Sequence, residues 1–369
     1  MRIGVVLGTR PEIMKNYAVV KALRAHRTQF VVLHTHQHYD DKMSRCLFEE
    51  MGYAPDYVMP GRYQIGMAID WVRRLIRRLD LDLVIVNGDT AAAVVGALAA
   101  VYSDTALAHV EAGLRSFDPH MVEERNRIIV DTAAHYLFTY TQAHAEYLTR
   151  IPDRRGRVYC AGNTTVDLIA DFADRLVAPR PDLGTYALVT LHRKELTDSR
   201  SRLISVFEAL NEVASGFDRV IFPIHPRTRQ AIQQHGLDPE CLSRVTVVEP
   251  LSALECLSYE KHARVILTDS GCIQEEAYLF GVPCVTIREN TERIETLPSG
   301  ANVLTGFNPE VILRCVSEQM TKSSLALPPI YGDPGAGERI VTVLLEHAIT
   351  KRLDLSSEKG PICAVNLMA

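Results

Sequence analysis

The sequence lacks several features that would place the protein in a particular class. Its eight cysteines are scattered and form no Cys-x-x-Cys pair, so we expect reduced thiols with neither disulfides nor a zinc site. No apolar stretch approaches the roughly 20 residues of a membrane-spanning helix. A net charge of −5 provides no electrostatic case for binding nucleic acid or an anionic membrane. These absences predict a globular cytoplasmic protein.

The dinucleotide fingerprint Gly-x-Gly-x-x-Gly is also missing at the first strand, and no spacing matches a metal site. The short apolar run at the N-terminus meets Gly-Thr-Arg-Pro at once, which indicates a first strand and not a signal peptide. We therefore expect neither a cofactor nor a metal ion.

Short apolar, β-branched runs alternate with helical patterns along all 369 residues. This alternation predicts parallel sheets covered on both faces, and the length favours two domains. A connector of low periodicity, Leu176–Gly184, separates two series of runs. We predict an α/β protein with two doubly wound Rossmann-like domains facing a cleft, residues 1–175 and 185–345, and a tail of residues 346–369 that the pattern does not place. The expected strands are Ile3–Leu7, Phe30–His34, Leu83–Asn87, Ala106–Val110, Tyr136–Thr139, Val158–Ala161, Tyr186–Leu191, Val220–Ile224, Val245–Val248, Val265–Thr268, Cys284–Ile287 and Val303–Thr305.

One stretch of the second series, Leu267–Gly281, has the pattern of a phosphate site. A buried strand ends in the small-residue turn Asp269-Ser270-Gly271, and a helix follows directly. A helix N-terminus offers free N–H groups, and glycine lets the backbone approach a ligand closely. The stretch therefore predicts an anchor for a nucleotide diphosphate.

Polar residues also follow the other strands, at the edge where ligands of parallel sheets bind. Some have ordinary explanations: Asp89 could cap the following helix, and Glu123 could be a first-turn acid favoured by the helix dipole. Together they predict a two-domain enzyme that acts on a nucleotide-linked substrate by acid/base chemistry. The candidates are Arg10 and Lys15, Asp89, Glu111, Glu123 and Arg127, His192, His225, and the loop Arg288–Arg293.

The chain resembles the non-hydrolysing UDP-N-acetylglucosamine 2-epimerase family from about residue 2 to about residue 345. That family is similar in fold to two-domain glycosyltransferases of the GT-B type. Ten motifs in one order carry the resemblance. They are GTRPE (Gly8–Glu12), QHYD (Gln37–Asp40), NGDT (Asn87–Thr90), HVEAGLR (His109–Arg115), EERNR (Glu123–Arg127), GNTTVD (Gly162–Asp167), HRKE (His192–Glu195), FPIHPRTR (Phe222–Arg229), TDSGCIQEEA (Thr268–Ala277) and TERIE (Thr291–Glu295).

The resemblance implies inversion at C2 of UDP-N-acetylglucosamine, through elimination of UDP to a 2-acetamidoglucal and its re-addition. It implies a UDP-sugar substrate and a homodimer. The implied catalytic residues are Asp89, Glu111 and Glu123, for proton transfer at C2 and stabilisation of the oxocarbenium ion, and His192, for the leaving diphosphate. The implied binding residues are Arg10 near the uracil, Ser270 and Gly271 at the diphosphate, Glu276 at the ribose, and Lys15, Arg115, Arg127, His225 and Arg293; Gln37 and His38 match a possible allosteric site.

Three departures from the family pattern lie near the sugar and the phosphate. Cys272 stands where the family usually has glycine, Asn87 where it has histidine, and Leu196 where it has asparagine. The sugar therefore stays open. The alternatives are a modified UDP-amino sugar, a hydrolysing epimerase that releases N-acetylmannosamine, a GT-B glycosyltransferase and a non-catalytic sugar-nucleotide sensor.

Overall fold

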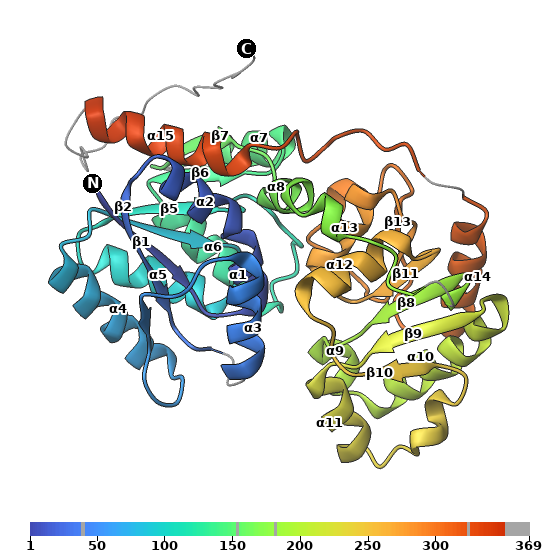
Figure 1. The fold of residues 1–369 in the computed structure, drawn as a ribbon. Coiled ribbons are helices and arrows are strands. Elements are labelled where there is room, and N and C mark those ends of the chain that lie inside the picture. Colours follow the sequence, from blue (N-terminus) through green and yellow to red (C-terminus); the bar gives the residue numbers. More distant parts are fainter. Residues whose placement is uncertain (38–40, 153–154, 181–182, 323–324, 351–369) are drawn as a thin grey trace. The chain divides into compact units, whose positions relative to one another are not determined.

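The computed structural model of the chain describes residues 1–37, 41–152, 155–180, 183–322 and 325–350. It divides into two compact units, the first comprising residues 1–171 with the segment from Ile330 onward, and the second comprising Phe172–Pro329. Each unit is a parallel sheet with helices packed over it (Figure 1). The predicted fold class of two doubly wound α/β units is confirmed. In the part of the chain that is described, no helix is long and apolar enough to span a membrane.

Unit 1 contains a seven-stranded sheet in the order β3-β2-β1-β4-β5-β6-β7, with every pair parallel. The strands are β1 (Arg2–Leu7), β2 (Gln29–His34), β3 (Tyr57–Val58), β4 (Leu83–Asn87), β5 (Ala106–Val110), β6 (Tyr136–Thr139) and β7 (Arg157–Cys160). The helices are α1 (Arg10–Lys15), α2 (Tyr17–Ala25), α3 (Asp41–Met51), α4 (Ile65–Leu79), α5 (Ala91–Val101), α6 (Val122–Ala133), α7 (Gln142–Thr149), α8 (Thr164–Asp171) and α15 (Ala336–Thr350).

Unit 2 contains a six-stranded parallel sheet in the order β10-β9-β8-β11-β12-β13. All twelve predicted strands are present within one residue at either end, and among the described residues the two-residue β3 is the one strand that was missed. The strands are β8 (Tyr186–Thr190), β9 (Arg219–Pro223), β10 (Thr246–Val248), β11 (Val265–Thr268), β12 (Cys284–Thr286) and β13 (Asn302–Leu304). The helices are α9 (Lys194–Thr197), α10 (Arg200–Val213), α11 (Pro226–Gln234), α12 (Ala253–His262), α13 (Gly271–Phe280) and α14 (Pro309–Met320).

The strand order reverses between β1 and β4 in unit 1, and between β8 and β11 in unit 2. At such a point the loops leave neighbouring strands in opposite directions and open a crevice for ligands. In unit 1 the segments Gly8–Glu12 and Gly88–Thr90 follow the two strands concerned. In unit 2 the corresponding segments are His192–Glu195 and Asp269–Gly271. The predicted polar segments therefore lie at the edge of each sheet where ligands bind.

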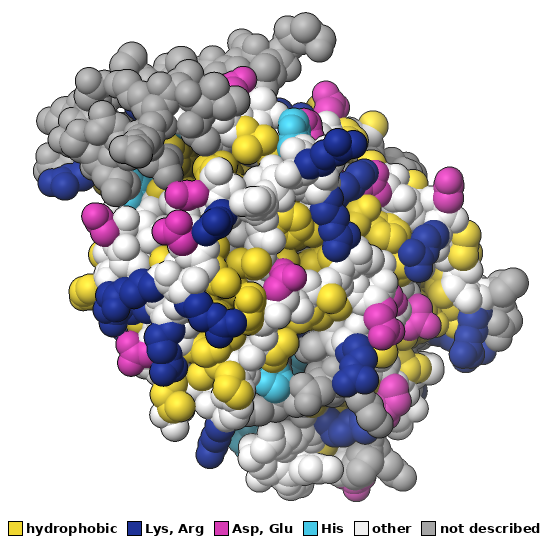
Figure 2. Space-filling model, turned by 60° about the vertical axis from the view of Figure 1, so that its left-hand side comes forward, with side chains coloured by type: hydrophobic (Ala, Val, Ile, Leu, Met, Phe, Trp, Pro, Cys, Tyr) yellow, Lys and Arg dark blue, Asp and Glu magenta, His cyan; other side chains and the backbone are white. Residues whose placement is uncertain are grey.

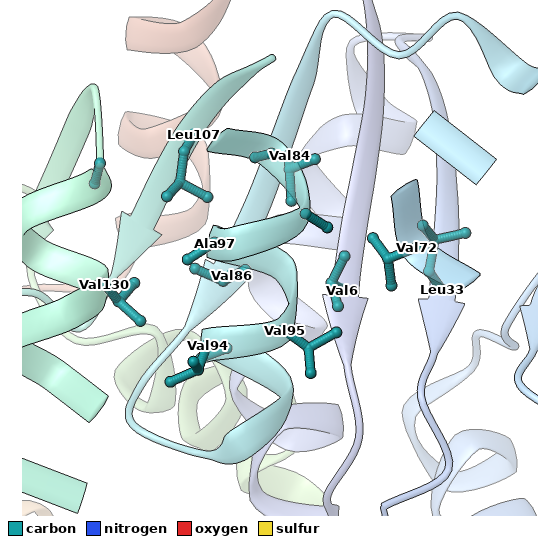
Figure 3. Packing of buried hydrophobic residues seen from close by; sticks show 14 of the residues in the cluster. Val6, Leu33, Val72, Val84, Val86, Val94, Val95, Ala97, Leu107 and Val130 are labelled. Carbon is teal, nitrogen blue, oxygen red and sulfur yellow. The ribbon is translucent and has the colours of Figure 1, made fainter. Parts of the chain in front are cut away.

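Close packing of α5 on the sheet positions the first of these crevices. The helix is rich in alanine and valine, and most of its residues are fully buried. One cluster joins Val95 and Ala97 of α5 to Val6 of β1 and Val86 of β4 (Figure 3). At Gly96 an added Cβ would lie 2.5 Å from Cγ1 of Val86, so the helix backbone rests directly on the strand.

The boundary of the second domain was predicted too far along the chain. Residues 330–345 were expected in that domain, but α15 packs on α2 and α8 of unit 1 (Figure 1). A Cβ on Gly337 would lie 2.3 Å from the carbonyl oxygen of Ala18, so the two helices touch at their backbones. Asp167 of α8 accepts hydrogen bonds from the N–H groups of Gly335 (2.9 Å) and Ala336 (3.0 Å) at the start of α15. Residues 346–350, which the pattern left unplaced, continue this helix.

Hydrophobic side chains also lie at the surface. Figure 2 shows them on one face of the molecule, among lysine and arginine side chains. Exposed large ones include Ile65 and Met67 of α4, with Val101 and Tyr102 at the end of α5. Scattered exposure of this kind is normal for globular proteins. The homodimer stays a prediction.

Two helical glycines allow a matched test of the α5 packing. We expect Gly96→Ala to lower the free energy of unfolding by about 1–3 kcal/mol, because overpacking against Val86 exceeds the helix propensity gained. Gly66→Ala in α4 has open space around its Cβ and should leave stability unchanged or slightly raised. The chain has one tryptophan, Trp71 in α4, so urea unfolding followed by its fluorescence reports on unit 1. Equal stability of the two variants would contradict the close packing.

Candidate active site

Glu111 is the centre of the polar cluster in unit 1. It follows β5 with a left-handed backbone (φ 70°), and its side chain is 2% exposed. Its carboxylate forms ion pairs with Lys15 and with Arg127, whose Nη2 is 2.6 Å from Oε1, and it accepts a hydrogen bond from the Tyr140 hydroxyl (2.8 Å). Two cations and a hydroxyl offset the cost of burying this charge. The structure thus brings together Glu111, Lys15 and Arg127, which the sequence predicted as site residues.

Asp89 joins the same cluster through Arg127. Nη2 of Arg127 lies 2.6 Å from Oδ2 of Asp89, so one guanidinium nitrogen contacts two of the three predicted catalytic acids. The position of Asp89 in the sequence had suggested that it caps α5, but it does not. Thr90 is the cap and accepts from the N–H of Ala93 (3.3 Å), which leaves the Asp89 carboxylate for Arg127. Asp89 is also partly open to solvent, with 19% of its side chain exposed.

Glu123 is the second residue of α6 and is half-buried. Arg127 stands four residues later, and residues at this spacing share one face of a helix. The next residue, Glu124, is the fully buried acid of this turn and accepts from the N–H of Ser116 (2.7 Å). The helix therefore directs Glu123 to the side on which Arg127 meets Asp89 and Glu111.

A buried ion pair below this cluster was not found from the sequence. The ring nitrogens of His109 lie 2.7 Å from Oδ1 of Asp131 and 2.9 Å from the carbonyl oxygen of Gly88, which accepts a hydrogen bond from Nε2. Burial by itself raises the pKa of Asp131, but the charges of His109 and Arg115 outweigh it and lower this pKa below its ordinary value. Arg115 lies 2.7 Å from Asp131 and is almost fully buried, so it supports the loop after β5 instead of extending into solvent.

Glu12 ties the loop after β1 to the loop after β4. Its carboxylate accepts from the N–H groups of Gly8 (2.9 Å) and Thr9 (2.8 Å) and from the Thr90 hydroxyl (2.6 Å). Burial raises the pKa of Glu12 to about 7 in spite of these bonds. Arg10 is the first residue of α1. The sequence placed Glu12 in a motif but assigned it no role.

Gln37 lies at the same edge of the sheet. Its side-chain oxygen accepts from the N–H of Ala92 in the first turn of α5 (3.2 Å). This contact places Gln37 beside the loop that carries Asp89. His38, its predicted partner in an allosteric site, lies outside the described residues.

In unit 2, Asp269 organises the loop after β8. It is fully buried and accepts from the N–H groups of His192 (2.8 Å) and Arg193 (2.7 Å), while Nδ1 of His192 lies 3.2 Å from its other oxygen. Burial, followed by the charges of Arg193, Arg227 and Arg288, lowers the pKa of His192 to about 3. His192 is therefore neutral near pH 7 and can act as a hydrogen-bond donor but not as a cation. The His225 ring packs against it, with centroids 5.1 Å apart.

The turn after β11 begins α13 as predicted, with one difference. Ser270 donates its own N–H to the Thr268 hydroxyl (2.9 Å), so this group is already occupied. The N–H groups of the first helical turn, from Gly271 onward, are the ones without partners inside a helix. An added Cβ on Gly271 would lie 2.5 Å from Oε1 of Glu292, a carboxylate that is held by Arg288 (2.8 Å). The glycine is thus required for this close approach.

The remaining predicted residues of unit 2 are buried. Arg293 forms an ion pair with Glu275 of α13, which fixes the loop after β12 to the helix and leaves the arginine 2% exposed. Glu276 is buried beside Glu260 of α12, which the sequence did not single out. Arg293 therefore supports the turn, and Glu276 belongs to a pair of acids.

The family model for UDP-N-acetylglucosamine 2-epimerase matches residues 21–345. This chain belongs to the UDP-N-acetylglucosamine 2-epimerase family. The resemblance noted from the sequence motifs is thereby confirmed. Within the described residues of this family member, no group of three or more His, Cys, Asp or Glu side chains could hold a metal ion.

Relatives in the family cover nearly the whole chain. The UDP-N-acetylglucosamine 2-epimerase of Methanococcus maripaludis is 37% identical over 93% of this chain and 98% of its own length. The UDP-2,3-diacetamido-2,3-dideoxy-D-glucuronate 2-epimerase of Pseudomonas aeruginosa is 36% identical over 93% of this chain and 99% of its own length. The crystal structure of the Methanocaldococcus jannaschii UDP-GlcNAc 2-epimerase in complex with UDP-GlcNAc and UDP superposes with a TM-score of 0.84, at 35% identity over 94% of this chain and all of that one. A spinosyn rhamnosyltransferase, 11% identical with a TM-score of 0.58, shares the fold alone, which agrees with the predicted GT-B type.

The raised pKa of Glu12 gives a test of its environment. The pKa of this carboxyl is 4.5 in the unfolded chain and about 7 in the folded protein. The folded state therefore binds the proton more tightly. This group's contribution to stability is fully present below about pH 4.5 and is lost as pH rises to about 7. We expect the wild type to lose up to about 3 kcal/mol relative to Glu12→Gln across this window, measured by urea unfolding with Trp71 fluorescence. A difference between the two proteins that does not change with pH would contradict the raised pKa.

Proposed function

We propose that this family member catalyses the reversible epimerisation of UDP-N-acetylglucosamine at C2, which gives UDP-N-acetylmannosamine. The observation that carries the proposal is the shared contact of Asp89 and Glu111 with Arg127, beside the half-buried Glu123. Acid/base chemistry at a carbon needs carboxylates fixed in place, and these are fixed by a buried guanidinium. The names of relatives that span the whole chain support the substrate.

The C2 proton of the sugar is not adjacent to a carbonyl, so it cannot be removed to give an enolate. In the proposed reaction a carboxylate takes the C2 proton, the C1–O bond breaks, and UDP leaves with the bonding electrons, which forms a C1–C2 double bond. UDP then adds back at C1 while a second group donates a proton to the opposite face of C2. Asp89, Glu111 and Glu123 share the proton transfers and stabilise the cation that develops at C1.

Unit 2 supplies the groups that would hold the leaving diphosphate. The first-turn N–H groups of α13, from Gly271 onward, are suited to a phosphate oxygen, and Ser270 directly precedes them at the N-cap. Arg193, Arg227 and Arg288, which lower the pKa of His192, also create a positive potential for the anion. His192 would donate a hydrogen bond to the diphosphate as a neutral imidazole. Glu276 would accept from the ribose hydroxyls.

A modified UDP-amino sugar is the second candidate substrate. The Pseudomonas aeruginosa relative named for a diacetamido-glucuronate is 36% identical, against 37% for the Methanococcus maripaludis relative. The two identities differ by one percentage point, so both sugar nucleotides are candidate substrates. Cys272, at the second residue of α13, adds to this alternative because it is a departure from the family pattern at the diphosphate.

The first test is turnover in deuterated water. We expect UDP-N-acetylglucosamine to yield its 2-epimer with deuterium at C2, because the proton returned to C2 comes from a group in exchange with solvent. Proton NMR of the sugar and mass spectrometry of the product measure both outcomes. The diacetamido-uronate nucleotide is tested beside it.

Each other outcome identifies a different function. Deuterium exchange at C2 only with the diacetamido-uronate nucleotide would mean that the enzyme is a 2-epimerase with that sugar nucleotide as its substrate. Free N-acetylmannosamine would indicate a hydrolysing enzyme. Binding of the nucleotide sugars without exchange or product would contradict epimerisation and favour a glycosyltransferase or a sensor.

The second test concerns the central acid. Glu111→Gln should lower kcat by about 10²- to 10⁴-fold, since the amide cannot accept a proton, while UDP binding should change little because the diphosphate groups belong to unit 2. Glu146→Gln, on an exposed face of α7, is the matched control and should keep wild-type turnover. Circular dichroism checks that both variants fold. Wild-type turnover in the folded Glu111→Gln variant would remove Glu111 from the reaction.

A further inference from the structure

We propose that Tyr140 is a positioning residue, whose hydroxyl fixes the orientation of the Glu111 carboxylate for the reaction. The proposal rests on the proposed function, in which Glu111 shares the proton transfers at C2. Tyr140 directly follows β6, and Glu111 directly follows β5, the neighbouring strand of the sheet. The sequence motifs did not single out Tyr140.

The donors around Glu111 are divided between its two carboxylate oxygens. The Tyr140 hydroxyl donates to Oε2 at 2.8 Å, and Lys15 forms its ion pair with the same oxygen. Nη2 of Arg127 lies 2.6 Å from the other oxygen, Oε1. Donors on both oxygens fix the rotation of the carboxylate as well as its place. Because Tyr140 is a neutral donor, it contributes direction without changing the charge of the cluster.

The ring of Tyr140 is itself held from two sides. Nζ of Lys15 lies 5.8 Å from the centroid of the ring, within the range of a cation–π contact. The ring of Tyr331 meets it at 89°, with the centroids 6.3 Å apart, in the edge-to-face arrangement that aromatic pairs favour. Tyr140 is 1% exposed. It therefore acts on the reaction through Glu111 and not by contact with the substrate.

Tyr331 is anchored by its backbone. It belongs to the segment from Ile330 onward that returns to unit 1, and its side chain is fully buried. Its carbonyl oxygen accepts from the N–H of Asn163 (3.0 Å), and an added Cβ on Gly162 would lie 3.0 Å from the same oxygen. The returning segment thus lies against the loop after β7 and keeps the Tyr140 ring in place.

This arrangement has a consequence for catalysis. Proton transfer at a carbon requires the carboxylate to be held close to one geometry. Without the hydroxyl, Lys15 and Arg127 would still offset the charge of Glu111, but the carboxylate would be freer to rotate. The loss should therefore appear in kcat and not in substrate binding, since the groups proposed to hold the diphosphate belong to unit 2.

The test compares two tyrosines of unit 1 by steady-state kinetics with the sugar nucleotide that the wild type turns over. Tyr140→Phe removes the hydroxyl and keeps the ring. It should lower kcat about tenfold or more, as expected for a hydrogen bond to a charged group, and leave KM and the Kd of UDP within about twofold. Tyr159→Phe is the matched control. It removes a buried hydroxyl that lies 3.2 Å from Nε2 of His347, and it should keep wild-type kcat.

A double-mutant cycle separates positioning from a structural role. In the Glu111→Gln background, Tyr140→Phe should lower kcat less than twofold further, because the amide cannot accept a proton in any orientation. Circular dichroism and urea unfolding check that each variant folds.

Four outcomes would overturn the role of Tyr140 alone. They are an unchanged kcat in Tyr140→Phe, a loss that lies in KM, an equal loss in Tyr159→Phe, and an equal further loss in the Glu111→Gln background. Wild-type protein that turns over neither sugar nucleotide would contradict the proposed function itself, and the role of Tyr140 with it.

Discussion

The site in unit 1 depends on one buried guanidinium. Arg127 contacts the carboxylates of Asp89 and Glu111 and also donates to the carbonyl of Glu111. Burying a carboxylate without a cation is costly, and Arg127 and Lys15 offset this cost for Glu111. Because Arg127 extends from α6, the helix that carries Glu123, the three acids are assembled by the packing of one helix against the sheet. The arrangement of these acids therefore depends on the contacts of Arg127.

The backbone around this guanidinium is held by a second layer of buried polar groups. The left-handed conformation of Glu111 is unfavourable for a residue with a side chain and persists only where its surroundings fix it. His109 joins the carbonyl of Gly88 to Asp131, and Arg115 completes the pair with Asp131. These bonds connect the loops after β4 and β5. They explain why Arg115, which resembles a ligand-binding arginine in sequence, is buried.

Unit 2 also contains buried acids that fix its loops. Asp269 accepts from two backbone N–H groups and so fixes the loop that carries His192, while Glu292 accepts from Arg288 beside Gly271. Glu260 of α12 is also buried, and burial, followed by the charge of Glu276, raises its pKa well above the ordinary value. Burial raises the pKa of an acid in each unit, Glu12 in unit 1 and Glu260 in unit 2.

The sequence by itself determined the strands, the two parallel sheets and the polar loops at their ends, because these follow from local alternation of apolar runs and helical patterns. The tertiary structure decided the partners. Lys15 and Glu111 are 96 residues apart in the sequence. Likewise, α12, which carries Glu260, packs against α13, which carries Glu276. Thr90 took the capping role from its neighbour Asp89, and α15 returned to unit 1, because side-chain geometry and packing between distant segments are not encoded in local periodicity.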